Sequence, residues 1–313
     1  MKTKTIFKGV LLASTSIASI SLLNRLITKE SIAQNLLYNN ETEYFNWRYG
    51  RIHYTKTGTG TPLLLIHELA ADASAYEWEQ LKYTLAQTHT VYSLDLLGCG
   101  RSEKPDFSYT NYTYVQLVTD FIRLVIGQPA DIVTSGESST IAIMAASSRP
   151  ELFHRIVMIT PESIYNGFRK PGKTSKLRKK LIDTPVIGTL IYNIAFSPRE
   201  ISSRLKKRCI QTASATDIAV RAEASHLGGG LAKQLYACIK GDYLHVPFRS
   251  ALQKTDLCLY LILGSENPEA KEIAEDYQME NPAVEVEWIS NAGHYPHIEQ
   301  ATDTAEMIQI FLS

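Results

Sequence analysis

The segment that decides the fold is DIVTSGESST, residues 131–140. It begins with a short apolar run and passes into a Gly-x-Ser turn made by Gly136 and Ser138. The small residues after this turn are typical of a helix. A strand, a sharp turn and a helix in this order are the surroundings that a nucleophilic serine requires, with Ser138 at the apex. The same residues also fit a simple turn in which Ser138 or Ser139 caps the helix N-terminus.

Strand-like and helix-like segments alternate on both sides of this turn. The apolar runs that predict strands are residues 63–67, 90–95, 155–160, 257–263 and 284–289. Continuous apolar runs are typical of parallel strands buried on both faces. Residues 44–56 alternate instead and predict an antiparallel hairpin that turns near Tyr49 and Gly50. Together these patterns predict an α/β fold with a mostly parallel sheet and right-handed crossovers.

The alternation stops between residues 165 and 245, where the sequence shows basic clusters and apolar helical pieces. We expect a helical cap here, inserted after the sixth strand. The predicted division is residues 1–30 as an N-terminal segment, 31–43 as a linker, 44–164 and 246–313 as the two parts of the core, and 165–245 as the cap. A helix from 75 to 87 is expected within the core.

Composition narrows the classes of function. The chain has 313 residues, 44% hydrophobic and 20% charged, which describes a globular protein with a sizeable core. Its formal net charge is zero, so we expect no nucleic-acid partner. The four cysteines are widely spaced and form no CxxC pair, so free thiols are expected rather than zinc ligands. We expect no metal and no organic cofactor.

The N-terminus has its own pattern. Three lysines, at positions 2, 4 and 8, precede an uncharged and mildly apolar stretch, residues 9–23. This is typical of a secretory signal or a signal anchor. We expect an uncleaved transmembrane anchor that binds the membrane and places the body of the protein on the extracytoplasmic side. A cleaved signal peptide, which would make the protein secreted, and an amphipathic or core helix are the alternatives.

Five segments resemble, in order, the motifs of the alpha/beta hydrolase fold family, and specifically its capped serine hydrolases. They are LLLIHE (63–68), DLLGCGRS (95–102), GESST (136–140), GSENP (264–268) and GHYPHIE (293–299). The resemblance covers about residues 44 to 313. It implies an eight-stranded sheet flanked by helices. It also implies hydrolysis of an ester or related acyl bond in a small, hydrophobic acyl substrate.

The resemblance also implies roles for particular residues. Ser138 would be the nucleophile, and His294, after the last predicted strand, would take its proton and later return it. The oxyanion hole would use the backbone N–H groups of Ser139, next to the nucleophile, and of Leu69.

The sequence departs from the family at three positions. Asn267 stands where the family carries the acid, so the acid is expected to be Glu266, with Glu162 as the alternative. Glu68 and Thr140 stand where the family carries glycine. These departures motivate a second hypothesis, a catalytically weak protein of this fold that uses the cleft to bind a ligand.

Overall fold

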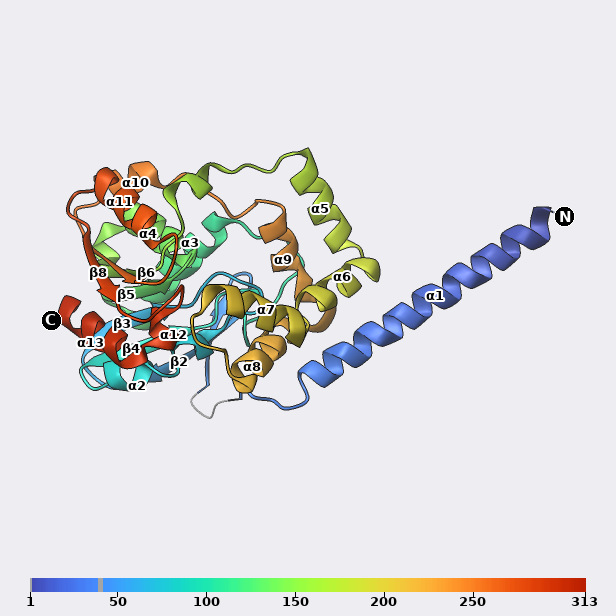
Figure 1. Ribbon diagram of the computed structural model, residues 1–313, viewed down its shortest axis with the longest axis horizontal. Coiled ribbons are helices and arrows are strands. Elements are labelled where there is room, and N and C mark those ends of the chain that lie inside the picture. Colours follow the sequence, from blue (N-terminus) through green and yellow to red (C-terminus); the bar gives the residue numbers. More distant parts are fainter. Residues whose placement is uncertain (1, 39–41) are drawn as a thin grey trace.

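The computed structural model describes residues 2–38 and 42–313, and side chains from residue 16 onward (Figure 1). The strands are β1 (Glu43–Trp47), β2 (Gly50–Thr57), β3 (Thr61–Ile66), β4 (His89–Leu94), β5 (Ala130–Ser135), β6 (Phe153–Ile159), β7 (Cys258–Gly264) and β8 (Glu285–Ile289). They form one sheet in the order β1-β2-β4-β3-β5-β6-β7-β8. The hairpin strands β1 and β2 run antiparallel to their neighbours, and the pairs from β4 to β8 are parallel.

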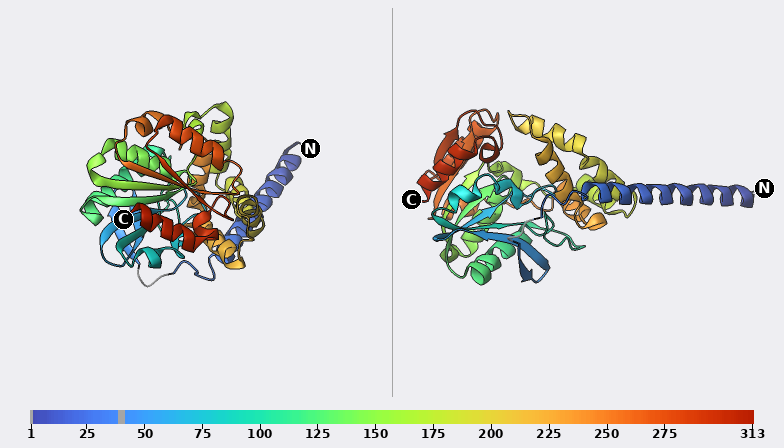
Figure 2. Two further views of the ribbon diagram at one scale, coloured as in Figure 1. Left: turned by 60° about the vertical axis from the view of Figure 1, so that its left-hand side comes forward. Right: turned by 90° about the horizontal axis from the view of Figure 1, so that it is seen from below.

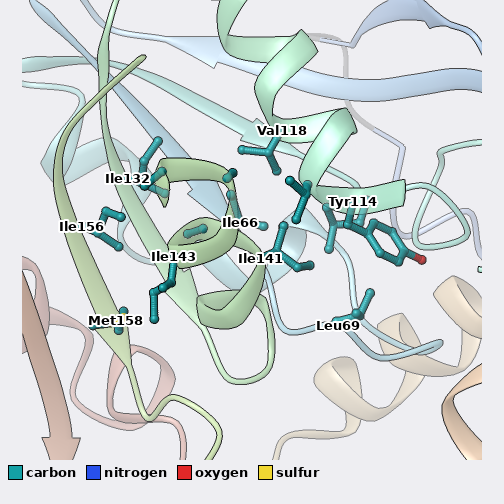
Figure 3. Packing of buried hydrophobic residues seen from close by; sticks show 14 of the residues in the cluster. Ile66, Leu69, Tyr114, Val118, Ile132, Ile141, Ile143, Ile156 and Met158 are labelled. Atoms are coloured by element: carbon teal, nitrogen blue, oxygen red, sulfur yellow. The ribbon is translucent and has the colours of Figure 1, made fainter. Parts of the chain in front are cut away.

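Helices cover both faces of the sheet (Figures 1 and 2). One face carries α3 (Asn111–Phe121), α4 (Ser138–Ser148), α10 (Arg249–Lys254) and α11 (Ala270–Glu280), and the other carries α2 (Lys82–Leu85), α12 (Pro296–Glu299) and α13 (Ala301–Phe311). Figure 3 shows Ile143 of α4 near Ile156 and Met158 of β6, and Ile141 near Ile66 of β3 and Tyr114 of α3. This packing fixes the turn before α4 at the carboxyl end of β5, a central strand of the sheet.

The cap follows β6. It comprises η4 (Ile164–Phe168), α5 (Lys173–Asp183), α6 (Ile187–Ala195), α7 (Pro198–Arg208), α8 (Ala215–His226), η5 (Gly229–Leu231) and α9 (Lys233–Lys240). These helices lie together on one side of the sheet before the chain returns to it (Figure 1). The predicted fold class, an eight-stranded and mostly parallel sheet with a helical cap after its sixth strand, is confirmed.

The helix expected from residue 75 to 87 is broken in the structure. A short 3-10 helix, η1 (Ala75–Trp78), is followed by the single turn of α2. The break lets Trp78 and Glu77 turn inward, where the Trp78 ring lies 4.9 Å from that of His297. Burial of these two side chains therefore overrides the local helical pattern.

The prediction of a transmembrane signal anchor, and with it of a membrane partner and a membrane-anchored location, is wrong. Residues Lys2–Ser31 form a single helix, α1, but no helix in the described part of the chain is long and apolar enough to cross a membrane. The stretch free of charge between Lys8 and Arg25 is shorter than the roughly 20 residues that a spanning helix needs, and it contains several serines.

The second half of α1 packs against the cap instead. The buried Asn24 donates through Nδ2 to the carbonyl of Val186 (3.0 Å) and accepts from Nδ2 of Asn193 (2.9 Å). The first half extends away from the body of the protein (Figures 1 and 2). Polar contacts of this kind attach α1 to α6 on the outer side of the cap.

Candidate functional site

The turn between β5 and α4 has its left-handed residue at Gly136. Its φ angle is +57°, a conformation that glycine adopts without steric cost. Glu137 follows with right-handed helical angles, and Ser138 already begins the helix. A Cβ atom at Gly136 would lie 2.9 Å from Cγ and 3.2 Å from Oε1 of Glu68. The apex of the turn is therefore Gly136, two residues before Ser138, and a side chain at Gly136 would point into space that Glu68 occupies.

Ser138 and Ser139 point into the protein. Ser138 is fully buried, and its Oγ donates to the carbonyl of His67 at 2.5 Å. The Ser139 hydroxyl lies 2.9 Å from that of Thr134, and the Ser139 N–H donates to the carbonyl of Gly136 at 3.1 Å. Both hydroxyls are thus bonded to neighbouring strands or loops, and the N–H group predicted for the oxyanion hole is bonded within the turn.

The loop after β3 carries the other predicted oxyanion donor. Leu69 has its side chain in the core beside α3 and α4 (Figure 3). The preceding His67 accepts through Nε2 from the N–H of Leu96 at 3.0 Å, so its Nδ1 is the donor to the carbonyl of Glu68 at 2.7 Å. This pair of bonds fixes the backbone from which Glu68 reaches the turn.

His294 faces Glu68. Its backbone N–H donates to the carbonyl of Arg208 (2.8 Å), and its Nε2 lies 3.8 Å from Oε1 of Glu68. Within residues 2–38 and 42–313, this buried Nε2 has no hydrogen-bond partner. The structure thus brings His294 to Glu68, and it does not bring His294 into a hydrogen bond with Ser138.

Glu68 is held from the cap and from the core. Its Oε1 accepts from Nη1 of Arg208, the last residue of α7, at 2.7 Å, and its Oε2 accepts from the hydroxyl of Tyr295 at 2.6 Å. Burial opposes ionisation of this carboxyl, but Arg208, His294 and Tyr295 together hold its pKa well below the usual range. Glu68 is therefore an ionised carboxylate with both oxygens occupied.

The two predicted acids lie elsewhere. Glu266 is exposed, and its carboxylate accepts from the hydroxyl of Ser265 at 3.2 Å. Glu162 pairs with Nδ1 of His245 at 3.2 Å. The carboxylate that the structure brings to His294 is instead that of Glu68. The role of acid for Glu266 or Glu162 stays a prediction.

Sequence reasoning missed the roles of Arg208 and Tyr295. Tyr295 directly follows His294 in the sequence. Its contact with Glu68 cannot be read from the sequence, because it forms only when the fold brings the loops after β3 and β8 together. Arg208 belongs to one of the basic clusters of the cap, and nothing in its local sequence indicates which basic side chain turns toward the core.

A cavity of about 240 Å³ lies between the cap and this turn. Charged and aromatic side chains line it, among them Glu68, Glu137, Arg208, Tyr236 and Tyr295. Burial, followed by repulsion from Glu162 and Glu68, raises the pKa of Glu137 to about 8. Of the carboxyls that line the cavity, that of Glu68 is therefore ionised and that of Glu137 mostly protonated at neutral pH, while Asp72 pairs with Arg204.

We expect Glu137 to make stability depend on pH. A folded-state pKa near 8, above the ordinary 4.5, stabilises the protein at low pH, and this contribution is lost as the pH rises through that interval. The isosteric Glu137→Gln variant should therefore unfold at a higher urea concentration than wild type at pH 9 and at nearly the same concentration at pH 5. An equal difference at both pH values would contradict the assignment.

Comparison with known proteins agrees with this architecture. The family model described as "Alpha/beta hydrolase family" matches residues 63–307. A soluble epoxide hydrolase from Corynebacterium sp. is 28% identical over 109 residues, which are 35% of this chain and 37% of that protein. A 2-hydroxy-6-oxo-6-(2'-aminophenyl)hexa-2,4-dienoic acid hydrolase from Metapseudomonas resinovorans is 37% identical over 71 residues, 22% and 24% of the two chains. The aligned segments span only about a third of the curated relatives' length.

Solved structures share the fold over almost their whole length. A serine hydrolase involved in carbazole degradation has a TM-score of 0.72 at 18% identity, covering 87% of this chain and 98% of its own. A carboxylesterase from Bacillus subtilis has a TM-score of 0.66 at 17% identity, covering 94% and 98%. The relatives and neighbours include hydrolases of several kinds. From the family match over most of the chain, and from the sheet and cap described above, this protein belongs to the alpha/beta hydrolase family.

Proposed function

We propose that this protein uses the hydrolase scaffold to bind a small molecule and has little or no acyl-transfer activity. The observation that carries the proposal is the turn after β5. In this family the nucleophile stands on the strained residue of the strand-to-helix turn. Here the left-handed residue is Gly136, which has no side chain, and the carboxylate of Glu68 fills the space in front of it.

The charge of the site supports the same proposal. Acyl transfer requires hydrogen-bond donors aimed at a developing oxyanion. Glu68 instead places an ionised carboxylate beside the turn, and a second negative charge there would be repelled. The donors that could compensate, Arg208 and Tyr295, are already bonded to Glu68. This arrangement stabilises a closed ion pair rather than a transition state.

The cavity beside the turn supports the proposal that this protein binds a small molecule. At about 240 Å³ it is slightly below the range of roughly 300–1,000 Å³ that small-molecule sites commonly have. Apolar side chains such as Phe196 and Ile239 line it together with charged ones, and this mixture suits a small ligand with both apolar and polar groups.

A serine hydrolase acting through Ser138, His294 and an acid is the second candidate. The observation in its favour is the position of His294, whose buried Nε2 lacks a hydrogen-bond partner in the described part of the chain. This candidate requires the Ser138 hydroxyl to leave the carbonyl of His67 and turn toward His294.

One labelling experiment tests both candidates. We expect the full chain to show no labelling by a fluorophosphonate probe above that of its Ser138→Ala variant, and no hydrolysis of short p-nitrophenyl esters above background. The reason is that the apex of the turn lacks a nucleophile. Labelling that Ser138→Ala and His294→Ala each abolish would overturn the binding proposal and establish the serine hydrolase.

A further inference from the structure

A second cavity lies on the other side of Arg221. It has a volume of about 280 Å³ and is enclosed by η1, the start of α8 and the end of α12. The apolar side chains of Leu205, Val220 and Ile298 form part of its wall. Arg221, on α8, lines both this cavity and the one beside the turn, as do Asp72 and Leu205, so the two spaces adjoin.

Every carboxylate that lines this second cavity in the described part of the chain already has a partner. The pairs are Asp72 with Arg204 (2.7 Å), Glu77 with His297 (2.9 Å), Glu79 with Lys82 (2.7 Å), Asp217 with the Ser214 hydroxyl (2.6 Å), and Glu299 with the N–H of Gly293 (2.8 Å). None of these acids therefore needs a ligand to satisfy it, and none offers an unpaired carboxylate to a cationic ligand.

Arg221 is different. It is the basic residue in the wall of this cavity, and its guanidinium lies over the ring of Tyr295, 5.4 Å from the centroid. Among the described residues, the guanidinium of Arg221 donates no hydrogen bond to an acceptor and has no carboxylate within ion-pair distance. Burial opposes its charge, but Tyr295, Asp72 and Glu77 hold the pKa of Arg221 above its ordinary value, so it stays protonated.

We propose that this cavity binds a carboxylate with an apolar tail, whose two oxygens accept hydrogen bonds from Arg221. A guanidinium presents its donors in a planar fork that matches a carboxylate, and such charge-assisted pairs are the strong ones. The tail would contact Leu205, Val220 and Ile298. The neighbouring acids weaken the attraction through space; Asp72 and Glu79 are offset by the charges of Arg204 and Lys82, whereas Asp217 and Glu299 accept from neutral donors.

The second cavity does not include the turn at Gly136, although Arg221 also lines the cavity beside that turn. The cavity volume lies near the lower end of the range for small-molecule sites, so the ligand is a short one. Octanoate is a suitable probe, and octanol and octylammonium are matched controls that keep the tail and change the charge of the head.

Calorimetric titration of the full chain tests the proposal. We expect octanoate to bind and octanol to bind at least about tenfold more weakly, because hydrogen bonds between charged groups are stronger than those of a neutral hydroxyl. Octylammonium should not bind measurably. Three outcomes with the wild-type protein would overturn the proposal. They are equal affinity for octanoate and octanol, stronger binding of octylammonium than of octanoate, and no binding of octanoate.

Two variants then locate the site. Arg221→Met keeps the length of the side chain and removes its charge, and it should weaken octanoate binding at least about tenfold. Lys240→Met removes a charge from the wall of the cavity beside the turn and leaves the second cavity untouched, so it should bind octanoate like wild type. Because Arg221 lines both cavities, Lys240→Met is the variant that distinguishes them, and weakened octanoate binding in Lys240→Met would place the ligand in the cavity beside the turn and refute the assignment.

Discussion

A chain that carries Gly136→Ser together with Glu68→Gly is expected to react with a fluorophosphonate probe that the unchanged protein does not take up. The side chain at position 136 would enter the space that Glu68 now fills. The Oε1 atom in that space lies 3.8 Å from Nε2 of His294, so the new hydroxyl would face a base. We expect labelling at least about 100-fold faster than in either single variant, since a nucleophile and its base act as a unit.

The single variants are the controls. Gly136→Ser alone should not label, because its Cβ would meet Glu68 at 2.9 Å and its left-handed backbone costs roughly 1–2 kcal/mol. Glu68→Gly alone provides space without a nucleophile. Adding His294→Ala to the double variant should abolish labelling. A folded double variant that stays unlabelled would refute the placement of the apex at Gly136.

Adding Asn267→Asp to the double variant should raise the rate again, by at least about tenfold, because an acid fixes the tautomer of the base and its loss from a triad costs about 10⁴ in kcat. The loop that carries Asn267 lies beside the loop of His294, since the N–H of Glu266 donates to the carbonyl of Ala292 at 3.0 Å. Nδ2 of Asn267 is buried without a hydrogen-bond partner among the described residues. An unchanged rate would show that position 267 does not supply the acid.

The fold could be predicted from the sequence because the parallel strands are long apolar runs separated by helical segments. The run at residues 63–67 became β3, and the alternating residues 44–56 became the β1–β2 hairpin. The segment from 75 to 87 was harder. Its local pattern is helical. Contacts distant in sequence, such as that between the rings of Trp78 and His297, favour burial of Trp78 and interrupt the helix, and a local pattern does not contain this information.

The candidate site could be predicted only in part. The Gly-x-Ser spacing identifies the turn but not which of its residues takes the left-handed angle, and the structure gives that angle to Gly136. Glu68 was recognisable as a departure from the family, whereas its partner Arg208 comes from the cap, whose orientation depends on contacts distant in sequence. The N-terminal lysines suggested an anchor because a basic start to a helix resembles one, even though α1 is too polar to span a membrane.

Arg208→Ala should destabilise the protein at neutral pH by about 2 kcal/mol. Removing one member of a buried ion pair typically costs about 3–5 kcal/mol, because the other charge is left uncompensated. Glu68 is only 6% exposed, but the Arg208 side chain is 47% exposed, so solvent screens the pair and the smaller figure applies. Urea unfolding of the two proteins at pH 7 measures the loss.

The dependence of this loss on pH identifies Glu68 as its cause. In wild type the pKa of Glu68 lies well below 4.5, so its contribution to stability is present above that pH and is lost as the pH falls toward the folded-state pKa. Burial is the largest single effect on Glu68 and favours its protonated form; without Arg208 only His294 and Tyr295 oppose it, so the pKa of Glu68 in the folded variant rises. The difference between wild type and Arg208→Ala should therefore be largest at pH 7 and shrink near pH 4. In the background of Glu68→Gln, Arg208→Ala should cost less than it does alone, and an equal cost in both backgrounds would show that the two side chains are not coupled.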